Sequence, residues 1–296
     1  MSDQAFALRG LIQQQQADGA DAPPAKPFSQ ASTIAITSGK GGVGKSNIAL
    51  NLAIALARSD NSVCLLDANL GLGNIDLLCG LNGYWNLSHV ITGARTLADI
   101  ILDGPAGIHV VPGASGLIDA ADVSASAQRE ILDQLEELER THDYLLIDTG
   151  TGIHKPIRRF LNAADIVLVV TTPEPTAIAD AYATLKSLST VVGPKLEVLV
   201  NQCDSSQQGR AIIDRIRKTA RLFINTDLDA AGFIPHDPHV PRAVIRRTPF
   251  IVEAPLAPAS QAIAQLARRM KNIAASRTPR GEFFANQWDA PQPEAA

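Results

Sequence analysis

The chain has 296 residues, of which 46% are hydrophobic, and a formal net charge of −4. This length fits one large α/β domain or two small ones, and the apolar content suffices for a core that needs no covalent staple. The small negative charge argues against a dedicated nucleic-acid-binding protein, and the sequence contains no run of 18 apolar residues. The cysteines are odd in number and form no C-x-x-C pair, so reduced, buried thiols in a cytoplasmic protein are predicted at Cys64, Cys79 and Cys203.

Residues 3–16 have the apolar spacing of a short helix, and Pro, Gly and Asp are frequent in the linker-like stretch that follows. From residue 32 onward, strand and helix patterns alternate. Strands are predicted at 32–38, 62–67, 107–111, 144–148, 166–171, 196–201 and 231–234, and helices at 45–58, 124–140, 153–162, 175–190 and 208–223.

This alternation predicts an α/β fold, with a mostly parallel sheet covered by helices on both faces. The sequence divides into an N-terminal helix (1–17), a flexible linker (18–31), an α/β domain (32–275) and a disordered tail (276–296).

A glycine-rich motif lies between the first predicted strand and the first predicted helix of the domain. It reads G-K-G-G-V-G-K-S from Gly39 to Ser46, which fits the P-loop pattern G-x-x-x-x-G-K-[ST]. Backbone N–H groups of such a loop converge on phosphate oxygens, its lysine reaches the β- and γ-phosphates, and its serine ligates Mg²⁺. The nucleotide-binding residues predicted from the motif are Gly39, Gly41, Gly42, Val43, Gly44, Lys45, Ser46 and Asn47.

The same glycines also fit the dinucleotide fingerprint G-x-G-x-x-G, with Asp67 near the place of a ribose-binding acid. A dinucleotide site, however, has no use for the pair Lys45-Ser46 directly after the last glycine. The sequence therefore favours a P-loop.

Asp148 ends the predicted strand 144–148 and begins the segment Asp-Thr-Gly-Thr-Gly. An acid at this place, opposite a P-loop serine, is the Walker B position, where the carboxylate holds Mg²⁺ through a water molecule. The alternative is a strand-terminal Asp that caps the next helix.

The combination resembles the MinD/ParA group of deviant Walker A ATPases. In that group the extra lysine of K-G-G-x-G-K-[ST], here Lys40, reaches across a dimer interface to the partner's phosphates. Its switch I reads D-x-D-x-G, where the first Asp, here Asp67, lies near the metal and the second positions the attacking water. The resemblance implies ATP and Mg²⁺ as cofactors, ATP hydrolysis as the reaction and a homodimer as the active form. It also implies the catalytic residues Lys40, Lys45, Asp67 and Asn69, and the metal ligands Ser46, Asp67 and Asp148.

The second switch I position holds Asn69 in place of the usual acid. An amide can orient water but cannot accept a proton, so hydrolysis slower by about 10²–10⁴-fold is expected. Two alternatives stay open: either Asp67 or Asp76 substitutes, or hydrolysis tolerates the amide.

Three further segments match positions of the same group. Thr172–Asp180 resembles its T-x-P-E…D segment, in which the Glu reaches the partner's nucleotide and the Asp, here Asp180, pairs with the signature lysine. Asn201 matches the position whose amide recognises adenine, although a turn Asn is the alternative, and residues 234–237 match a loop that wraps the base. The nucleotide-binding residues that the resemblance adds are Glu174, Asn201, Pro235 and Asp237.

The N-terminus resembles the D-Q-A-x-x-L-R motif of the FlhG/FleN flagellar-number regulators. In that family the segment is a tethered helix that stimulates a GTPase of the signal-recognition-particle type; packing on its own core is the alternative. The partner-activating residues implied are Asp3, Gln4, Ala5, Leu8 and Arg9. A flagellar transcription activator and basal-body proteins are further partners to consider.

Members of this family usually end in an amphipathic membrane-binding helix. Here residues 260–275 fit a last core helix better, with apolar residues on one face. The tail beyond it offers cations and aromatics for a weak contact at the inner face of the membrane, namely Arg277, Arg280, Phe283, Phe284 and Trp288.

The sequence therefore favours an ATP-dependent dimerisation switch that controls flagellar number or placement. A MinD-type division-site regulator and a DNA-partition ATPase are the alternatives, and an iron–sulfur carrier is disfavoured by the cysteine spacing. A partition ATPase would need a basic surface, for which the densest cations are Arg242, Arg246, Arg247, Arg268, Arg269 and Lys271.

Overall fold

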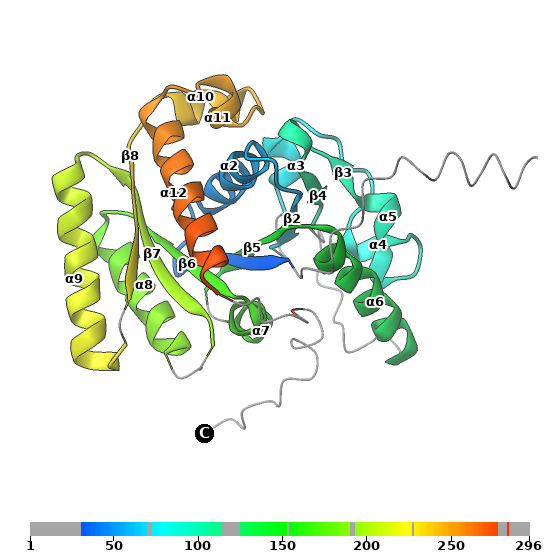
Figure 1. Ribbon diagram of the computed structural model, residues 1–296, viewed down its shortest axis with the longest axis horizontal. Coiled ribbons are helices and arrows are strands. Elements are labelled where there is room, and N and C mark those ends of the chain that lie inside the picture. Colours follow the sequence, from blue (N-terminus) through cyan, green and yellow to red (C-terminus); the bar gives the residue numbers. More distant parts are fainter. Residues whose placement is uncertain are drawn as a thin grey trace, which may run out of the picture.

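The computed structural model describes residues 31–69, 73–113, 125–152, 154–189, 193–226 and 228–277, together with Phe283. This part of the chain forms one eight-stranded sheet in the order β3-β4-β2-β5-β1-β6-β7-β8 (Figure 1). Neighbouring strands are parallel except at the edge, where β3 runs antiparallel to β4. The strands are β1 (Ser32–Ser38), β2 (Val63–Ala68), β3 (Leu102–Asp103), β4 (His109–Val111), β5 (Tyr144–Thr151), β6 (Ile166–Thr171), β7 (Lys195–Cys203) and β8 (Asp229–Pro235).

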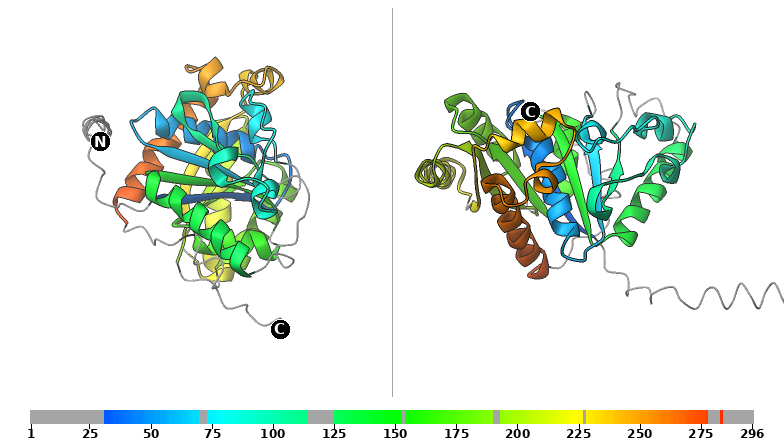
Figure 2. Two further views of the ribbon diagram at one scale, coloured as in Figure 1. Left: turned by 90° about the vertical axis from the view of Figure 1, so that its right-hand side faces the viewer. Right: turned by 90° about the horizontal axis from the view of Figure 1, so that it is seen from above.

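Helices lie on both faces of this sheet, as Figures 1 and 2 show. The longer ones are α2 (Lys45–Ala57), α6 (Ala125–Thr141), α7 (Lys155–Ala163), α8 (Pro175–Leu188), α9 (Ser206–Ile224) and α12 (Pro258–Ala275). The shorter ones are α3 (Ile75–Leu78), α4 (Leu87–Ile91), α5 (Leu97–Ile100), the 3-10 helix η1 (Pro105–Gly107), α10 (His239–Ile245) and α11 (Phe250–Glu253). None of the described helices combines the length and hydropathy needed to cross a bilayer.

The alternation of side chains along the central strand separates two apolar cores. Ile34 and Ile36 of β1 belong to the core on the side of α2 and α12, whereas Ala35 between them belongs to the core on the opposite face. Successive strand residues point to opposite faces, so both faces of a sheet covered on two sides must be apolar. This is the sandwich of layers that the sequence predicts, and the predicted fold class is confirmed.

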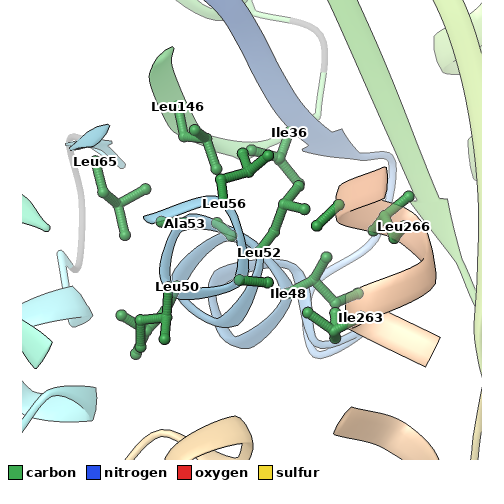
Figure 3. Close-up of a cluster of buried hydrophobic side chains, with 14 of the residues drawn as sticks. Ile36, Ile48, Leu50, Leu52, Ala53, Leu56, Leu65, Leu146, Ile263 and Leu266 are labelled. Atoms are coloured by element: carbon green, nitrogen blue, oxygen red, sulfur yellow. The ribbon is translucent and has the colours of Figure 1, made fainter. Parts of the chain in front are cut away.

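Helix α2 is buried on nearly all sides, which explains why its sequence is apolar all round rather than in one stripe. It packs against the sheet and against α3, α11 and α12. Figure 3 shows Ile48, Leu52 and Leu56 of α2 among strand and α12 side chains, including Ile36 and Ile263. This packing holds the start of α2 in place relative to the end of β1, so the loop between them has fixed ends.

The seven predicted strands and the six long helices predicted from residue 45 onward all exist, with ends that differ by a few residues. The predicted strand 107–111 begins only at His109, because residues 105–107 form η1. The elements that the sequence did not predict, β3, α3, α4, α5, α10 and α11, have two to seven residues each. Such short elements complete at most two helical turns, so they carry no readable period.

Two predicted boundaries at the chain ends need correction. Ala31, assigned to the flexible linker 18–31, is buried, and its N–H donates to the carbonyl oxygen of Glu139 at 3.0 Å. Phe283, assigned to the disordered tail, is only 1% exposed, and its N–H donates to Oε2 of Glu139 at 2.9 Å. Its ring lies 6.2 Å from that of Phe160 in α7. Phe283 is thus part of the core and is not exposed for a membrane contact.

Candidate nucleotide site

The glycine-rich loop runs from the end of β1 into α2, with Gly44 as the residue before the first helical turn. Gly42 and Gly44 have φ angles of 78° and 90°, a left-handed region that favours glycine. Gly39 is required for a different reason, because a Cβ there would lie 2.4 Å from the carbonyl oxygen of Asp180 in α8. Ser46 and Asn47 lie in the first turn of α2, where its backbone N–H groups begin. The predicted loop residues are therefore contiguous at one helix N-terminus, the usual place for a phosphate.

Two buried carboxylates lie beside the lysine of this loop. Nζ of Lys45 is 2.8 Å from Oδ1 of Asp148, and the two side chains are 6% and 1% exposed. Asp67 of β2 is the register partner of Asp148 in β5. Burial, and secondarily the charge of Asp148, raises the pKa of Asp67 to about 6. Two neighbouring carboxylates, of which Asp67 has a raised pKa, are well placed to gain from a divalent cation.

The donor set fits Mg²⁺. The hydroxyl of Ser46 and the carboxylates of Asp67 and Asp148 are hard oxygen ligands, and Mg²⁺ is usually held by one or two carboxylates plus phosphates and water. In the described part of the chain, no cluster of three or more His, Cys, Asp or Glu side chains could hold a metal by itself. The three residues could therefore hold Mg²⁺ together with a bound nucleotide.

Asp67 is held in place by the backbone around it. Its carboxylate accepts N–H hydrogen bonds from Asn69 at 3.1 Å, Asn74 at 2.9 Å and Ile75 at 3.3 Å. Ile75 is the first residue of α3, so the Asp67 carboxylate accepts a hydrogen bond from the N-terminus of this short helix, which the sequence did not predict. A change at Asp67 would therefore be felt by α3.

Gly113 is a site residue that the sequence reasoning missed. A Cβ on Gly113 would lie 2.6 Å from the carbonyl oxygen of Asp67 and 3.0 Å from its Cγ, while one on Gly73 would lie 2.9 Å from Oδ2. The two glycines thus let the chain pack directly against the carboxylate. Gly113 follows β4 and Gly73 precedes α3. The sequence around Gly113 matches no motif, so only the packing identifies this residue.

Asn69, the unusual switch I residue, lies close to strand β5 just after Asp148, the predicted Walker B residue. A Cβ on Gly150 would lie 3.3 Å from Oδ1 of Asn69. The structure therefore brings the switch I residue Asn69 close to Gly150 in the segment that begins at the predicted Walker B residue Asp148. The effect of Asn69 on hydrolysis stays a prediction.

The signature lysine pairs within its own chain. Nζ of Lys40 forms a close ion pair with Glu174 and donates to Oγ1 of Thr176 at 3.0 Å. The hydrogen bond from Lys40 lowers the pKa of Glu174. The resemblance assigned Lys40 to Asp180 instead, but Asp180 lies with its backbone against Gly39. Thr176 was not predicted, and only its proximity to Lys40 reveals it.

The predicted base-binding residues are spread over two strands. Asn201 of β7 donates from Nδ2 to the carbonyl oxygen of Val43 at 2.8 Å, so its amide contacts the phosphate loop itself. Asp237, just after β8, is buried and accepts N–H bonds from His239 at 2.9 Å and Ala259 at 3.0 Å. Burial alone would raise the pKa of Asp237, but these hydrogen bonds outweigh it and lower the pKa. The Asp237 side chain therefore ties α10 to α12, and only its backbone and Pro235 remain for a base.

The structure describes the predicted cysteines but not the predicted partner-activating residues. Cys64, Cys79 and Cys203 are buried free thiols, as predicted, and burial raises their pKa values to about 12, 12 and 11. The partner-activating residues Asp3, Gln4, Ala5, Leu8 and Arg9 lie outside the described residues.

Comparison with known proteins identifies the group. A family model described as "ParA: NUBPL iron-transfer P-loop NTPase" matches residues 29–271. The antiactivator FleN of Pseudomonas aeruginosa is 38% identical over 257 residues, which cover 86% of this chain and 92% of FleN. The flagellum site-determining protein YlxH of Helicobacter pylori is 38% identical over 238 residues, covering 79% of this chain and 80% of YlxH.

The fold is likewise shared with solved structures. MinD of Pyrococcus horikoshii, complexed with Mg-ADP, superimposes with a TM-score of 0.68 at 23% identity, covering 83% of this chain and 98% of that one. One conclusion follows from the P-loop with its second lysine, the paired acids at the strand ends, the parallel sheet and these similarities. The chain belongs to the MinD/ParA family of P-loop ATPases, and its relatives include FleN and YlxH.

Proposed function

We propose that this protein is an ATP-dependent dimerisation switch that regulates the number or placement of flagella. The observation that carries the dimerisation part is the direction of Lys40. Its side chain, 35% exposed, leaves the phosphate loop and pairs with Glu174 just before α8, whereas Lys45 turns inward to Asp148. A loop that binds phosphates with Lys45 thus has a second, accessible cation for the nucleotide of another copy.

The flagellar part rests on relatives. FleN and YlxH are each 38% identical to this chain over most of its length, and the name of YlxH describes a flagellum site-determining protein. The N-terminal D-Q-A-x-x-L-R motif adds a partner GTPase to the proposal, with Leu8 and Arg9 as the contact residues. A cytoplasmic protein with weak or no membrane contact is expected.

The test combines light scattering after size exclusion with ATP hydrolysis, for the native chain, Lys40→Ala and Asn69→Asp. We expect ATP, but not ADP, to convert the native monomer into a dimer, and Lys40→Ala to stay monomeric with ATP bound. If the native chain dimerises but hydrolyses only after Asn69→Asp, the switch is held in its dimeric state by slow turnover. Equal, fast hydrolysis by both would show that the amide is tolerated. A native chain that stays monomeric with ATP would contradict the proposal.

The partner is tested separately. Leu8→Ala combined with Arg9→Ala should abolish stimulation of the partner GTPase while ATP binding by this chain is unchanged. Unchanged stimulation would exclude the N-terminal segment as the activator.

A DNA-partition ATPase is the second candidate, and the structure weakens it. Two of the six cations that would form its basic surface are neutralised by acids, Arg269 by the buried Glu197 and Arg246 by Glu253. Salt-dependent binding to nonspecific DNA would favour this candidate, and so would loss of that binding in Arg242→Ala. A division-site regulator of the MinD type would instead require a division phenotype without a flagellar one.

A further inference from the structure

The amide of Asn201 contacts the phosphate loop directly. Its Nδ2 lies 2.8 Å from the carbonyl oxygen of Val43, a residue 158 positions away in sequence. Asn201 is 9% exposed and Val43 is buried, so water competes little for this hydrogen bond. The bond also sets the orientation of the amide, because the opposite flip would place Oδ1 against the carbonyl oxygen of Val43.

An irregularity of strand β7 lies right beside Asn201. The pairing of β7 with β8 shifts register between Val200 and Cys203, and Gln202 has a φ angle of 59°. Asn201 stands on the same side of the sheet as Leu199, which belongs to the core around α2. Bulges of this kind end regular pairing and re-aim side chains. The strand thus places the polar side chain of Asn201 against the loop. An apolar residue at this position would continue the core.

The end of the loop receives a hydrogen bond from outside, the one from Asn201 to Val43. Gly41 and Gly42 are exposed, with nothing within 4 Å of a Cβ built on either. Gly44, the residue before α2, offers no side-chain cap to the helix. A Cβ on Gly44 would lie 2.4 Å from Nδ2 of Asn201, so the absence of a side chain at Gly44 lets the amide reach Val43.

We infer that Asn201 is a positioning residue of the phosphate-binding loop: it holds the Val43 carbonyl toward β7, so that the following N–H groups can face the phosphates. This inference rests on the proposed binding of ATP. A carbonyl turned toward the phosphates would repel them, whereas one held by Asn201 cannot turn. The amide therefore acts on phosphate affinity through the loop, whether or not it also contacts a base.

A ligand without a base separates the two roles. Titration calorimetry with Mg-ATP and with magnesium tripolyphosphate is compared for the native chain and for Asn201→Ala. Loss of one buried hydrogen bond should weaken binding about three- to tenfold, and by a similar factor for both ligands. Weakening for ATP alone would overturn the inference and leave a base contact only. Unchanged binding of both ligands would also overturn it.

The matched control is Asn61→Ala. Asn61 likewise donates from Nδ2 to a backbone carbonyl, that of Leu56 at 2.7 Å, but at the opposite end of α2. This variant should bind both ligands as the native chain does. If Asn201→Ala fails to fold, Asn201→Ser replaces it with the same expectations.

Hydrogen exchange of the nucleotide-free chain adds a readout that needs no ligand. The amides of residues 43–46 should exchange faster in Asn201→Ala than in the native chain, and remain unchanged in Asn61→Ala. Unchanged exchange at these amides would contradict the inference even if the native chain bound no ATP. Failure of the native chain to bind ATP would, by contrast, count against the proposed function.

Discussion

Lys45 and Asp148 form a buried ion pair, with Nζ 2.8 Å from Oδ1, that joins the phosphate loop to the end of strand β5. Desolvation makes each charge costly without the other, so the pair holds the two segments together. Phosphates of a nucleotide bound as we propose would therefore compete with Asp148 for the lysine. Asp148, once released, is a carboxylate at the place where Mg²⁺ would bind.

Removal of one partner of this pair should destabilise the nucleotide-free fold. In Asp148→Asn the buried Lys45 loses its counter-charge, and we expect the free energy of unfolding to fall by about 3–5 kcal/mol. Urea denaturation measures the change. The control is Lys195→Ala, which breaks the exposed pair with Asp229 and should cost less than about 1 kcal/mol. Equal effects of the two variants would mean that burial does not determine the strength of the Lys45–Asp148 pair.

The raised pKa of Asp67 predicts how nucleotide binding depends on pH. The pKa is about 6 in the folded chain against an ordinary value of 3.8, so Asp67 binds more protons folded than unfolded between these pH values. Its contribution to stability is therefore largest at low pH and is lost as the pH rises through about 6. A cation needs the ionised carboxylate, so affinity for Mg-ADP should rise about fivefold from pH 5 to pH 6 and level off above about pH 7, at about tenfold the affinity at pH 5.

Asp67→Asn is the control for the titration of the nucleotide itself. The variant has no carboxylate to titrate at this position, so its affinity for Mg-ADP should be lower and should follow only the nucleotide's own protonation. A native profile with the same slope as that of Asp67→Asn would mean that Asp67 is not the titrating group.

Gly113→Ala tests the close packing around Asp67. The added Cβ would lie 2.6 Å from the carbonyl oxygen of Asp67, which backbone atoms cannot relieve without a shift. We expect a loss of Mg-nucleotide affinity of about tenfold or more, with a stability loss of about 1–3 kcal/mol as for other overpacked sites. Calorimetry and denaturation measure the two effects. Native affinity in this variant would show that the β4 end can move without cost.

Phe283→Ala tests whether the residue beyond α12 belongs to the domain. Phe283 is almost fully buried and its ring lies near that of Phe160, so its truncation should cost about 3–5 kcal/mol of stability. Leu222→Ala is the matched control, because Leu222 is a large apolar residue on α9 that is 77% exposed. Removal of residues 277–296 should destabilise the fold at least as much as Phe283→Ala. No effect of either change would restore the predicted disordered tail at this position.

Local patterns in the sequence were sufficient for the fold class and for the phosphate loop. Strand β6 is an apolar run, β5 begins with one and β1 has one at its centre, while α2 follows a motif whose residues are adjacent in sequence. None of these elements requires knowledge of distant contacts. The same holds for Asp67 and Asp148, because the ends of parallel strands must meet at one edge. At these positions the structure brings the residues together as the sequence predicted, while their roles in binding stay predictions.

Contacts between distant segments were decided only by the tertiary structure. The pairing of Lys40 with Glu174, the reach of Asn201 to Val43 and the packing of Gly113 on Asp67 join residues 46 to 158 positions apart. Phe283 stands in a polar, proline-rich stretch of sequence, yet apolar side chains from other elements bury it. The sequence by itself determined the longer elements and the chemistry available at the strand ends, because both depend on neighbours along the chain. Which donor meets which acceptor depended on how the sheet and helices pack, and that is a property of the whole chain.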